Sequence, residues 1–557
     1  MPGSYSDPHI CLCLTRLSTF RRHSPVSISG SRVKTGKEFV DGVVDLASGL
    51  INIGIKSGDV VAISAFNSDL YLEWLLAITY VGAIAATLNY RWSLEEALLA
   101  MEDVKPVMLV TDNEYAIQAH SVPSLRWHVL MDTNNRYSST ENILTTSMLK
   151  MPSPRRHSFN YTSNCDGVAI VCFTSVLKKN VYLHTAPLGH VGGLSSALTM
   201  LMVGGCHVLM PKFEAKLALE AIEEYHVTSF ITVPTIMSDI ISLIRTKYTR
   251  KELPMVKKIL NGGGSLSTNQ IKDATDIFPN AGLFTAYGMT EGCSSLTFMT
   301  LKDPTKQTTV EEELAVDTQH EGICVGKPAP HVELKIRTED SAHAGQILTR
   351  GPHLMIGYWG QMHMEENHGN EGWHETGDIG RIDDHGNLWL IGRMKGRIKS
   401  GGENIYPEEV EAVLLRHPGI SAIAVIGLPD NRLTEMVVAC IQLNHNWTWT
   451  GSGSDPLGIK KQQTISSETL QQFCRTNNLT GFKVPRRFIR WSKKFPLTTS
   501  GKLRRDQLKI YKVAIYGIYA GIEVDKLMSL KRRLGGSRNM NKSSMTKLSH
   551  IGWAMKE

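Results

Sequence analysis

Residues Thr285–Ser295, TAYGMTEGCSS, bring an aromatic ring, a glycine, a hydroxyl and a carboxylate close together in the chain. The residues concerned are Tyr287, Gly288, Thr290 and Glu291. An aromatic ring can stack on a flat ligand, a hydroxyl can bond a phosphate oxygen, and a carboxylate can hold a divalent cation. The segment therefore indicates a site for a flat, phosphorylated ligand and a metal ion. A turn with a buried tyrosine is the alternative interpretation.

A glycine triplet, Gly262, Gly263 and Gly264, lies in the segment LNGGGSLS that follows the apolar run VKKIL. Glycine lets a backbone approach a flat ligand closely, and the Ser-x-Ser that follows can cap a helix. Taken alone, this segment favours a plain turn between a strand and a helix over a binding loop.

Three further segments combine charge with turn residues. In ETGDIG, Asp378 could accept hydrogen bonds from both hydroxyls of a ribose, or it could stabilise its own turn. In residues 391–411, IGRMKGRIKSGGENIYPEEVE, four basic residues precede a glycine pair and a helix start, which suits either an anion site or a solvated loop. In FPLTTSGKLRRDQL, Lys502 stands on a Ser-Gly turn, although a single surface lysine need have no role.

Alternating helix and strand patterns surround these segments. Between Gly36 and about Val110, and again over residues 221–260, amphipathic helices alternate with apolar strands, which indicates a parallel sheet. After about residue 320 the strands are shorter, and DDHGN at 383–387 has the composition of a hairpin turn. Further on, a helix opened by Pro407 and two apolar strands indicate a smaller α+β unit.

These patterns predict an α/β protein in three parts. We expect a large N-terminal domain of parallel and mixed sheets with a β-rich part over residues 1–392, a small α+β domain over 393–510, and a basic tail without a clear fold over 511–557. A chain of 557 residues is long enough for more than one hydrophobic core, and 42% hydrophobic with 20% charged residues fits a globular protein.

The net charge of +7 arises at the C-terminal end of the sequence. Residues 509–557 hold ten Lys or Arg and three acids, so the rest of the chain is balanced. No DNA- or RNA-binding motif accompanies this basic segment, and we expect no nucleic-acid partner. Nine cysteines without C-x-x-C spacing indicate reduced thiols of an intracellular protein rather than a zinc or redox site.

Two segments resemble membrane or targeting signals. Tyr71–Leu88 is apolar, but Glu73 and the marginal length favour a buried helix that runs into a strand, so we expect no transmembrane segment. The N-terminus carries Arg16, Arg21 and Arg22 among serines, which is a weak transit-peptide pattern, and the sequence has no Ser-Lys-Leu end.

The order of the chemical segments resembles one family. LNGGGSL, YGMTE, TGD, GRMKGRIKSGGENIYPEEVE and PLTTSGK follow one another as in the adenylate-forming, AMP-binding acyl-CoA synthetases, over roughly residues 10–510. NYRWSLEEA, HTAPLGHVGGLSSA and MPKFEAK look most like the plant members that act on 2-succinylbenzoate in phylloquinone synthesis. The resemblance implies the adenylate-forming ligase fold and a location in the chloroplast or the peroxisome.

The resemblance also implies a reaction. Family members convert a carboxylate and Mg-ATP to an acyl-adenylate and pyrophosphate, then rotate the small domain so that the thiol of coenzyme A displaces AMP. We therefore expect ATP, Mg²⁺ and coenzyme A as cofactors and a small aryl carboxylate as the substrate. The oligomeric state stays open.

The matched motifs imply roles for the residues that would hold adenosine. Tyr287 would stack on adenine, with Gly288 beside it and the glycine triplet close to the base and the acyl group. Asp378 and Arg393 would bind the ribose hydroxyls.

Other matched residues would act on the phosphates and the carboxylate. By resemblance, Thr290 would bond phosphate oxygens and Glu291 would hold Mg²⁺. Lys502 would bridge the substrate carboxylate and the α-phosphate, where its charge offsets the repulsion between the two anions. Lys395 occupies the hinge position of the small domain.

The remaining candidates concern the acyl group and coenzyme A. Gly401 and Gly402 would line the pantetheine passage. His190 matches an acyl-pocket or channel residue, although a structural role is equally consistent with a lone histidine. The second carboxylate of a succinylbenzoate needs a cation or several donors, for which Lys212 and Ser265 are candidates.

The sequence departs from the family between CFTS and YLHTAP, where the family has a Ser/Thr/Gly/Lys-rich phosphate loop and then a helix. Here Thr174 and Ser175 run directly into VLKKNVYLHTAP, which indicates a deletion between residues 175 and 181. A parallel crossover needs a dozen or more residues. Lys178 and Lys179 cannot replace a nest of glycine N–H groups around a phosphate.

Three functions therefore stay open. The first is a 2-succinylbenzoate–CoA ligase whose activity is impaired or lost in this chain. The second is a non-catalytic pseudoenzyme that binds AMP or an acyl-adenylate. The third is a ligase for another aryl or fatty acid, such as 4-coumarate.

Overall fold

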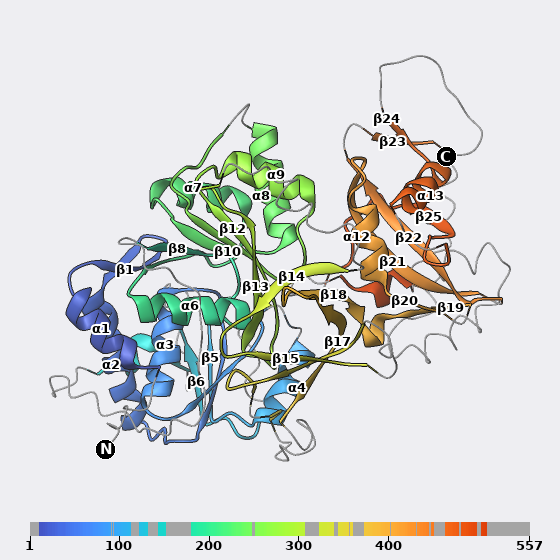
Figure 1. The fold of residues 1–557 in the computed structure, drawn as a ribbon. Coiled ribbons are helices and arrows are strands. Elements are labelled where there is room, and N and C mark those ends of the chain that lie inside the picture. Colours follow the sequence, from blue (N-terminus) through green and yellow to red (C-terminus); the bar gives the residue numbers. More distant parts are fainter. Residues whose placement is uncertain are drawn as a thin grey trace, which may run out of the picture. The chain divides into compact units, whose positions relative to one another are not determined.

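The computed structural model divides into two compact units, shown with their helices and strands in Figure 1. The first comprises residues 1–320 and 324–390, and the second comprises residues 321–323 and 391–557. The structure describes residues 10–90, 92, 94–112, 122–131, 143–151, 180–247, 251–306, 322–338, 344–355, 357–359, 372–401, 403–430, 432–444, 447–450, 463–477, 479, 481–497 and 503–509. The predicted deletion after Ser175 and the tail over 511–557 lie outside the described residues.

A five-stranded sheet of the first unit has parallel strands throughout. Its order is β4-β3-β5-β6-β7. The strands are β3 (Val60–Ser64), β4 (Ile84–Thr87), β5 (Met108–Thr111), β6 (Trp127–Leu130) and β7 (Ile143–Thr145). The helices of this part of the chain are α2 (Gly36–Asn52), α3 (Asp69–Tyr80), α4 (Leu94–Val104) and α5 (Thr146–Leu149). The parallel sheet predicted between Gly36 and Val110 is therefore confirmed.

Local capping explains where the two long helices of this region begin. The Thr35 hydroxyl accepts from Glu38 N at 3.3 Å, and the Glu38 carboxylate accepts from Thr35 N at 2.8 Å, which forms a capping box for α2. The Ser68 hydroxyl accepts from Tyr71 N at 3.1 Å at the start of α3.

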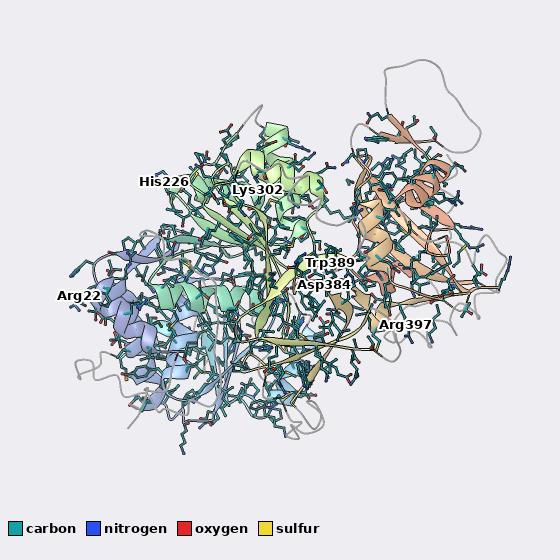
Figure 2. The ribbon with its side chains drawn as sticks, in the orientation of Figure 1. Arg22, His226, Lys302, Asp384, Trp389 and Arg397 are labelled. Carbon is teal, nitrogen blue, oxygen red and sulfur yellow. The ribbon has the colours of Figure 1, made fainter. Side chains whose placement is uncertain are left out.

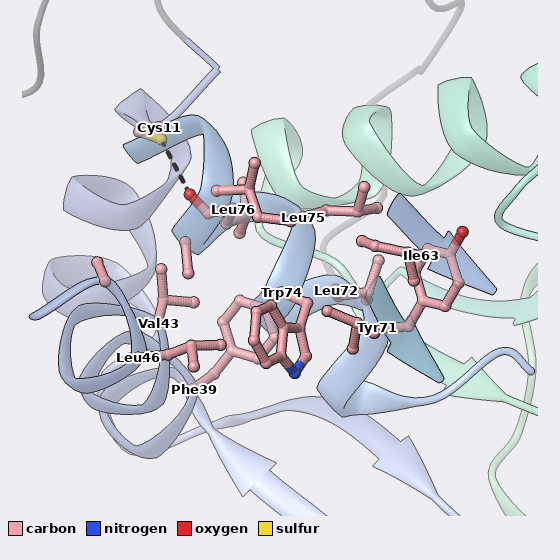
Figure 3. Close-up of a cluster of buried hydrophobic side chains, with 14 of the residues drawn as sticks. Cys11, Phe39, Val43, Leu46, Ile63, Tyr71, Leu72, Trp74, Leu75 and Leu76 are labelled. Carbon is pink, nitrogen blue, oxygen red and sulfur yellow. Dashed lines mark hydrogen bonds between the residues drawn. The ribbon is translucent and has the colours of Figure 1, made fainter. Parts of the chain in front are cut away.

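Helices α2 and α3 pack through apolar side chains into a core of the first unit (Figure 3). Phe39 and Trp74 are fully buried there, and the Cys11 thiol donates to Leu76 O at 3.8 Å. The Tyr71–Leu88 prediction is confirmed, because α3 ends at Tyr80 and β4 begins at Ile84. In the part of the chain that the structure describes, no helix is both long enough and apolar enough to cross a membrane.

The segment with the weak transit-peptide pattern contains a packed helix, α1 (Leu12–Phe20). Its Cys13, Leu14 and Leu17 side chains are buried in the same core. Arg16 Nη1 donates to Met202 O at 2.7 Å. This arginine therefore contributes to the folded first unit.

Glu73, which argued against a membrane helix in the sequence, lies in a buried ion cluster. Its side chain is 0% exposed and contacts Lys34 Nζ at 2.5 Å and Lys150 Nζ at 2.7 Å. Asp69, one turn earlier on α3, contacts Lys34 at 2.7 Å and Arg32 at 2.8 Å. Cations from β2 (Arg32–Thr35) and from the end of α5 thus compensate both buried acids.

A larger mixed sheet has the order β15-β16-β17-β18-β14-β13-β12-β11-β10-β8-β9-β1-β2. Strands β1, β9, β8, β10, β11 and β12 are parallel to their neighbours in this series, whereas β12, β13 and β14 are antiparallel, as are β15, β16 and β17. The strands are β1 (Pro25–Ser29), β2 (Arg32–Thr35), β8 (Val181–His184), β9 (Cys206–Leu209), β10 (Ser229–Thr232), β11 (Lys258–Asn261), β12 (Gly282–Met289), β13 (Ser294–Lys302), β14 (Ile323–Pro328), β15 (Glu333–Arg337), β16 (Gly345–Arg350), β17 (His374–Ile382) and β18 (Leu388–Arg393). The helices between them are α6 (Val191–Val203), α7 (Ala215–Glu224), α8 (Pro234–Lys247) and α9 (Thr268–Ile277), and α8 packs against α7 and α9 (Figure 1). Parallel and mixed sheets in the N-terminal region agree with the prediction.

The turn DDHGN connects β17 and β18 beside Trp389, which is labelled in Figure 2. The Asp383 carboxylate accepts from Asn387 N and Trp389 Nε1, both at 2.8 Å, and Gly386 has a φ of +79°. Partial burial would raise the pKa of Asp383, but these donors lower it below its ordinary value. The predicted hairpin turn is confirmed.

The second unit is a small α+β structure. Its five-stranded sheet has the order β20-β19-β22-β21, with β25 parallel to β22. The strands are β19 (Ile398–Ser400), β20 (Glu403–Ile405), β21 (Ile420–Asp430), β22 (Thr434–Leu443) and β25 (Arg487–Arg490), with a separate pair β23 (Trp447–Trp449) and β24 (Gln463–Ile465). The helices are the 3-10 turn η2 (Met394–Gly396), α12 (Pro407–Leu414) and α13 (Ser467–Thr476). Helix α12 begins at Pro407 as predicted.

Candidate nucleotide-binding site

Two of the predicted motifs follow neighbouring parallel strands. The glycine triplet comes directly after β11, and Thr290 comes directly after β12. The two strands pair in register, with Asn261 opposite Thr285. Because neighbouring parallel strands end at the same edge of a sheet, the two motifs lie at one edge, where α/β proteins bind ligands.

The glycine loop presents its backbone to solvent. Gly263 has a φ of +69°, which other residues adopt only with strain, and a Cβ at Gly262 would meet no atom within 4 Å. Asn261 Nδ2 donates to Gly264 O at 2.6 Å, which connects the two ends of the glycine loop. There is therefore room for a flat ligand close to this backbone.

A helix cap follows the glycine loop as the Ser-x-Ser pattern predicted. The Ser267 hydroxyl accepts from Gln270 N at 3.2 Å, and Gln270 Oε1 accepts from Ser267 N at 2.8 Å at the start of α9. The interpretation as a plain strand-to-helix turn is thus correct for the local backbone, and it is compatible with a binding loop.

Two residues that were predicted separately meet in the structure. The Tyr287 hydroxyl on β12 donates to Asp378 Oδ2 on β17 at 2.7 Å, and Asp378 is only 6% exposed. Gly377, with a φ of +73°, precedes Asp378 within β17, and the Asp378 N–H donates to the Thr376 hydroxyl at 3.1 Å. The Tyr287 ring also packs against an apolar cluster around Leu296, although it is only half-buried and not fully buried as the alternative interpretation expected. The Tyr287 side chain is therefore held by apolar packing of its ring and by the hydrogen bond of its hydroxyl.

Thr290 and Glu291 occupy the turn between β12 and β13. Thr290 is exposed. Glu291 is held by two hydrogen bonds, because its O accepts from Met355 N at 2.8 Å and its Oε1 accepts from the Tyr358 hydroxyl at 2.9 Å. The hydrogen bond to Glu291 raises the pKa of Tyr358 and keeps its hydroxyl protonated. Across the described ranges no group of three or more His, Cys, Asp or Glu could hold a metal ion. A single carboxylate still suits Mg²⁺, which keeps several waters and binds substrate phosphates.

The acyl-side candidates have identifiable local roles. His190 caps α6, because its Nδ1 accepts from Gly192 N at 3.2 Å, which agrees with the structural alternative for this histidine. Lys212 Nζ lies 4.2 Å from the centroid of the Phe66 ring. Ser265 is exposed on the glycine loop.

The remaining candidates belong to the second unit. Arg393 is exposed at the end of β18, and Lys395 lies in η2. Gly401 has a φ of +62° in the turn between β19 and β20, and its N–H donates to Leu433 O at 2.8 Å. Gly402 and Lys502 lie outside the described residues.

The sequence motifs missed several residues of this site. Asn261 was inside a quoted motif, and its position directly before the glycines could have identified it. Tyr358 contacts Glu291 in the turn after β12, and Ser195 contacts Ser294, the first residue of β13; no local pattern indicates either contact.

A nucleotide-binding α/β enzyme with a small second domain is the class that this fold and site define. The AMP-binding enzyme family matches residues 18–175 and 154–359, and the AMP-binding enzyme C-terminal domain matches residues 409–502. The chain belongs to the AMP-binding enzyme family, as its motifs predicted.

Named relatives lie within that family. A chloroplastic/peroxisomal 2-succinylbenzoate–CoA ligase of Arabidopsis thaliana is 51% identical over 91% of this chain and 97% of its own length. A 2-succinylbenzoate–CoA ligase of Bacillus cereus is 27% identical over 84% of this chain and 91% of its own length. Among solved structures, o-succinylbenzoate CoA synthetase of Bacillus subtilis in complex with its acyl-adenylate intermediate is similar with a TM-score of 0.69 and 23% identity, covering 89% of this chain and 97% of that one. The likeness confirms the adenylate-forming ligase fold.

Proposed function

We propose that the chain is an acid–thiol ligase that joins 2-succinylbenzoate to coenzyme A through an acyl-adenylate, with ATP consumed and AMP and pyrophosphate released. The 51% identity to the Arabidopsis thaliana ligase across nearly the whole of both chains carries this proposal. The exposed glycine loop and the bonded pair of Tyr287 and Asp378 are compatible with it.

The first unit would hold the nucleotide. The Tyr287 ring would stack on adenine, and Asp378 would accept from the ribose hydroxyls beside it. Thr290 would bond a phosphate oxygen. Mg²⁺ held through Glu291 would neutralise phosphate charge.

The second unit would complete both half-reactions. Lys502 would bridge the carboxylate and the α-phosphate, which favours attack by positioning and by charge. Arg393 would reach the ribose, and Lys395 would act at the hinge between the proposed domains, residues 1–392 and 393–510. Gly401 and Gly402 would line the passage for the pantetheine arm of coenzyme A.

The acyl pocket would be lined by residues of the first unit. Lys212 and Ser265 would contact the distal carboxylate, and His190 would border the pocket while capping α6. A ligase for another aryl or fatty acid would differ chiefly here.

We further propose that the chain is a slow ligase because it lacks a phosphate loop. The alignment with the Arabidopsis thaliana ligase runs over 549 positions, whereas 91% of this chain's 557 residues is about 507, so about 40 aligned positions have no residue here. The direct run of Ser175 into VLKKNVYLHTAP supports placing the loss there. The same observation favours the second candidate function, a protein that binds AMP or an acyl-adenylate without turnover.

The purified chain, Mg-ATP, coenzyme A and 2-succinylbenzoate give the decisive assay, with thioester and pyrophosphate both measured. We expect thioester formation, and we expect a chain with a Gly/Ser/Thr-rich segment inserted after Ser175 to react about 100-fold faster or more, as when charge-stabilising donors are restored. A panel with 4-coumarate and fatty acids tests the substrate. No thioester from either chain, with AMP binding retained in calorimetry, would replace the ligase proposal by the binding-protein alternative.

We propose a chloroplast or peroxisome as the compartment, because the Arabidopsis thaliana relative is named for both. A fluorescent fusion of the full chain, imaged with markers for the two organelles, tests this. A cytosolic signal would contradict it.

A further inference from the structure

The turn that carries Thr290 and Glu291 has an unusual backbone. Cys293 has a φ of +50° and Ser294 a φ of +125°, so two successive residues with side chains occupy the region that favours glycine. Such conformations persist only where the surroundings determine them, and they gather at functional sites. The turn is therefore held by something outside itself.

Two features hold the turn: a close approach of two backbone segments and a contact between two hydroxyls. A Cβ at Gly288 would lie 1.7 Å from Ser294 O, so the absence of a side chain lets β12 and the start of β13 approach this closely. From α6, the Ser195 hydroxyl lies 3.0 Å from the Ser294 hydroxyl, and Ser195 is 8% exposed. A partly buried pair of hydroxyls thus joins α6 to the strained residue Ser294.

The two halves of the nucleotide site depend differently on this turn. Tyr287 lies on β12 before the turn and is fixed by Asp378 on β17. Thr290 lies on the turn itself, where Cys293 N donates to its O at 3.0 Å. A change in the turn should therefore move the phosphate contact while the adenosine contacts stay.

We propose that Ser195 is a positioning residue: through the Ser294 hydroxyl it holds the strained turn in the conformation that presents Thr290 to the phosphate of the nucleotide. This inference rests on the proposed function, because it takes Thr290 as a phosphate contact. It assigns to the Ser195 hydroxyl a role that is exerted through Ser294.

The next residue of α6 supplies a matched control. Ser195 and Ser196 are both helical, and both donate to Gly192 O, at 3.3 and 2.8 Å. Ser195 contacts Ser294 as well. Ser195→Ala and Ser196→Ala therefore remove the same chemical group from adjacent positions, and only the first removes the contact to the turn.

Calorimetry of the full chain with AMP and with adenosine separates the phosphate contact from the base and ribose contacts without requiring turnover. We expect the wild-type chain to bind AMP more tightly than adenosine. Ser195→Ala should weaken AMP binding about fivefold, the effect of one lost neutral hydrogen bond, and leave adenosine binding unchanged. Ser196→Ala should change neither affinity.

A second variant tests the strain. Ser294→Gly removes the same hydroxyl pair but relieves the backbone, so it should weaken AMP binding like Ser195→Ala while it raises the melting temperature. Ser294→Ala, which keeps a side chain at the strained φ, should weaken AMP binding without that rise.

The outcomes distinguish the inference from the function it rests on. An unchanged ratio of AMP to adenosine affinity in Ser195→Ala overturns the role of Ser195 and leaves the nucleotide site standing. Equal loss of AMP and adenosine binding also overturns it, since Ser195 would then support the fold in general. A wild-type chain that binds AMP no more tightly than adenosine removes the phosphate contact at Thr290 and with it the inference.

Discussion

The first unit buries two acids among three cations, whereas the second unit places two acids around one cation. In the first unit Asp69 and Glu73 on α3 contact Lys34, Arg32 and Lys150 at 2.5–2.8 Å. Each of the two carboxylates there has at least one cation of its own, Arg32 beside Asp69 and Lys150 beside Glu73, which compensates the cost of burying it.

In the second unit Arg505 is shared. Its Nη2 contacts Glu411 Oε2 at 2.7 Å, its Nη1 contacts Glu408 Oε1 at 3.1 Å, and its Nε donates to Val425 O at 3.2 Å. Glu411 also accepts from Val425 N at 2.7 Å. One guanidinium thus connects α12, β21 and the helix start that follows the proposed catalytic Lys502.

The two clusters therefore respond to pH in opposite directions. Burial raises the pKa of Asp69, but Lys34 and Arg32 outweigh it and the net shift is downward. Burial raises the pKa of Glu411 to about 7, because Glu408 opposes the single arginine. Burial is the largest single influence on both carboxyls, and the number of cations beside each decides whether that influence is outweighed.

The largest effect should come from breaking the balanced cluster. Glu73→Ala leaves Lys34 and Lys150 without their shared carboxylate in a buried setting, and we expect it to destabilise the chain by about 3–5 kcal/mol. Calorimetric unfolding of the full chain measures this. A loss below about 1 kcal/mol would mean that solvent reaches the cluster.

An exposed pair on the neighbouring helix supplies the control. Lys37 and Asp41 form an i,i+4 contact at 2.5 Å on α2, with side chains 49% and 35% exposed. Replacing Asp41 by Ala should cost no more than about 0.5 kcal/mol. The comparison separates burial from the mere presence of an ion pair.

The next effect concerns the pH dependence of the second unit. A carboxyl whose pKa is higher in the folded than in the unfolded chain stabilises the fold when protonated, and that contribution is lost as the pH rises from about 4.5 to about 7. For Glu411 the loss is at most about 3 kcal/mol. Glu411→Gln keeps a neutral acceptor for Val425 N, so it should remove this loss and be more stable than wild type at pH 8.

Hydrogen exchange of the amides in α12 and β21, corrected for the intrinsic rate at each pH, measures this change. Asp69 gives the internal contrast, because a lowered pKa removes stability only as the pH falls below its ordinary value of 3.8. The same decline in both chains between pH 5 and 8 would show that Glu411 ionises freely in the fold.

The two ion clusters show why local sequence patterns predicted the helices and strands but not the long-range contacts that stabilise them. The alternation over 36–110 was sufficient for the parallel sheet, because period and composition are local properties. Glu73 stood out in the sequence only as a charge in an apolar run, since Lys34 and Lys150 are 39 and 77 residues away. Similarly, α1 looked like a targeting pattern because its burial depends on contacts distant in the sequence, such as Arg16 to Met202.

The candidate site shows the same difference between residues that the sequence identified and contacts that only the structure revealed. Tyr287 and Asp378 were found as members of ordered motifs, but their hydrogen bond joins residues 91 positions apart. The bond between Ser195 and Ser294 spans 99 positions, and it was missed although both serines lie in quoted segments, because no local pattern pairs them. Residue type and order identified the candidate site residues. Which side chains hydrogen-bond to one another became apparent only from the tertiary contacts.

The smallest effect should come from removing the second acid, Glu408, that shares Arg505 with Glu411. Glu408 lies one turn before Glu411 on α12 and raises its pKa by like charge, while it also contacts Arg505. In Glu408→Gln, Arg505 has Glu411 as its one remaining charged partner among these two acids, so the pKa of Glu411 should fall. About 1 kcal/mol of the stability that wild type loses between pH 5 and 8 should then return. Titration of Glu411 by carbon-13 NMR in the variant and in wild type measures the shift directly. An unchanged pKa would mean that burial alone sets it, and the ratio of cations to acids would then not explain the difference between the two units.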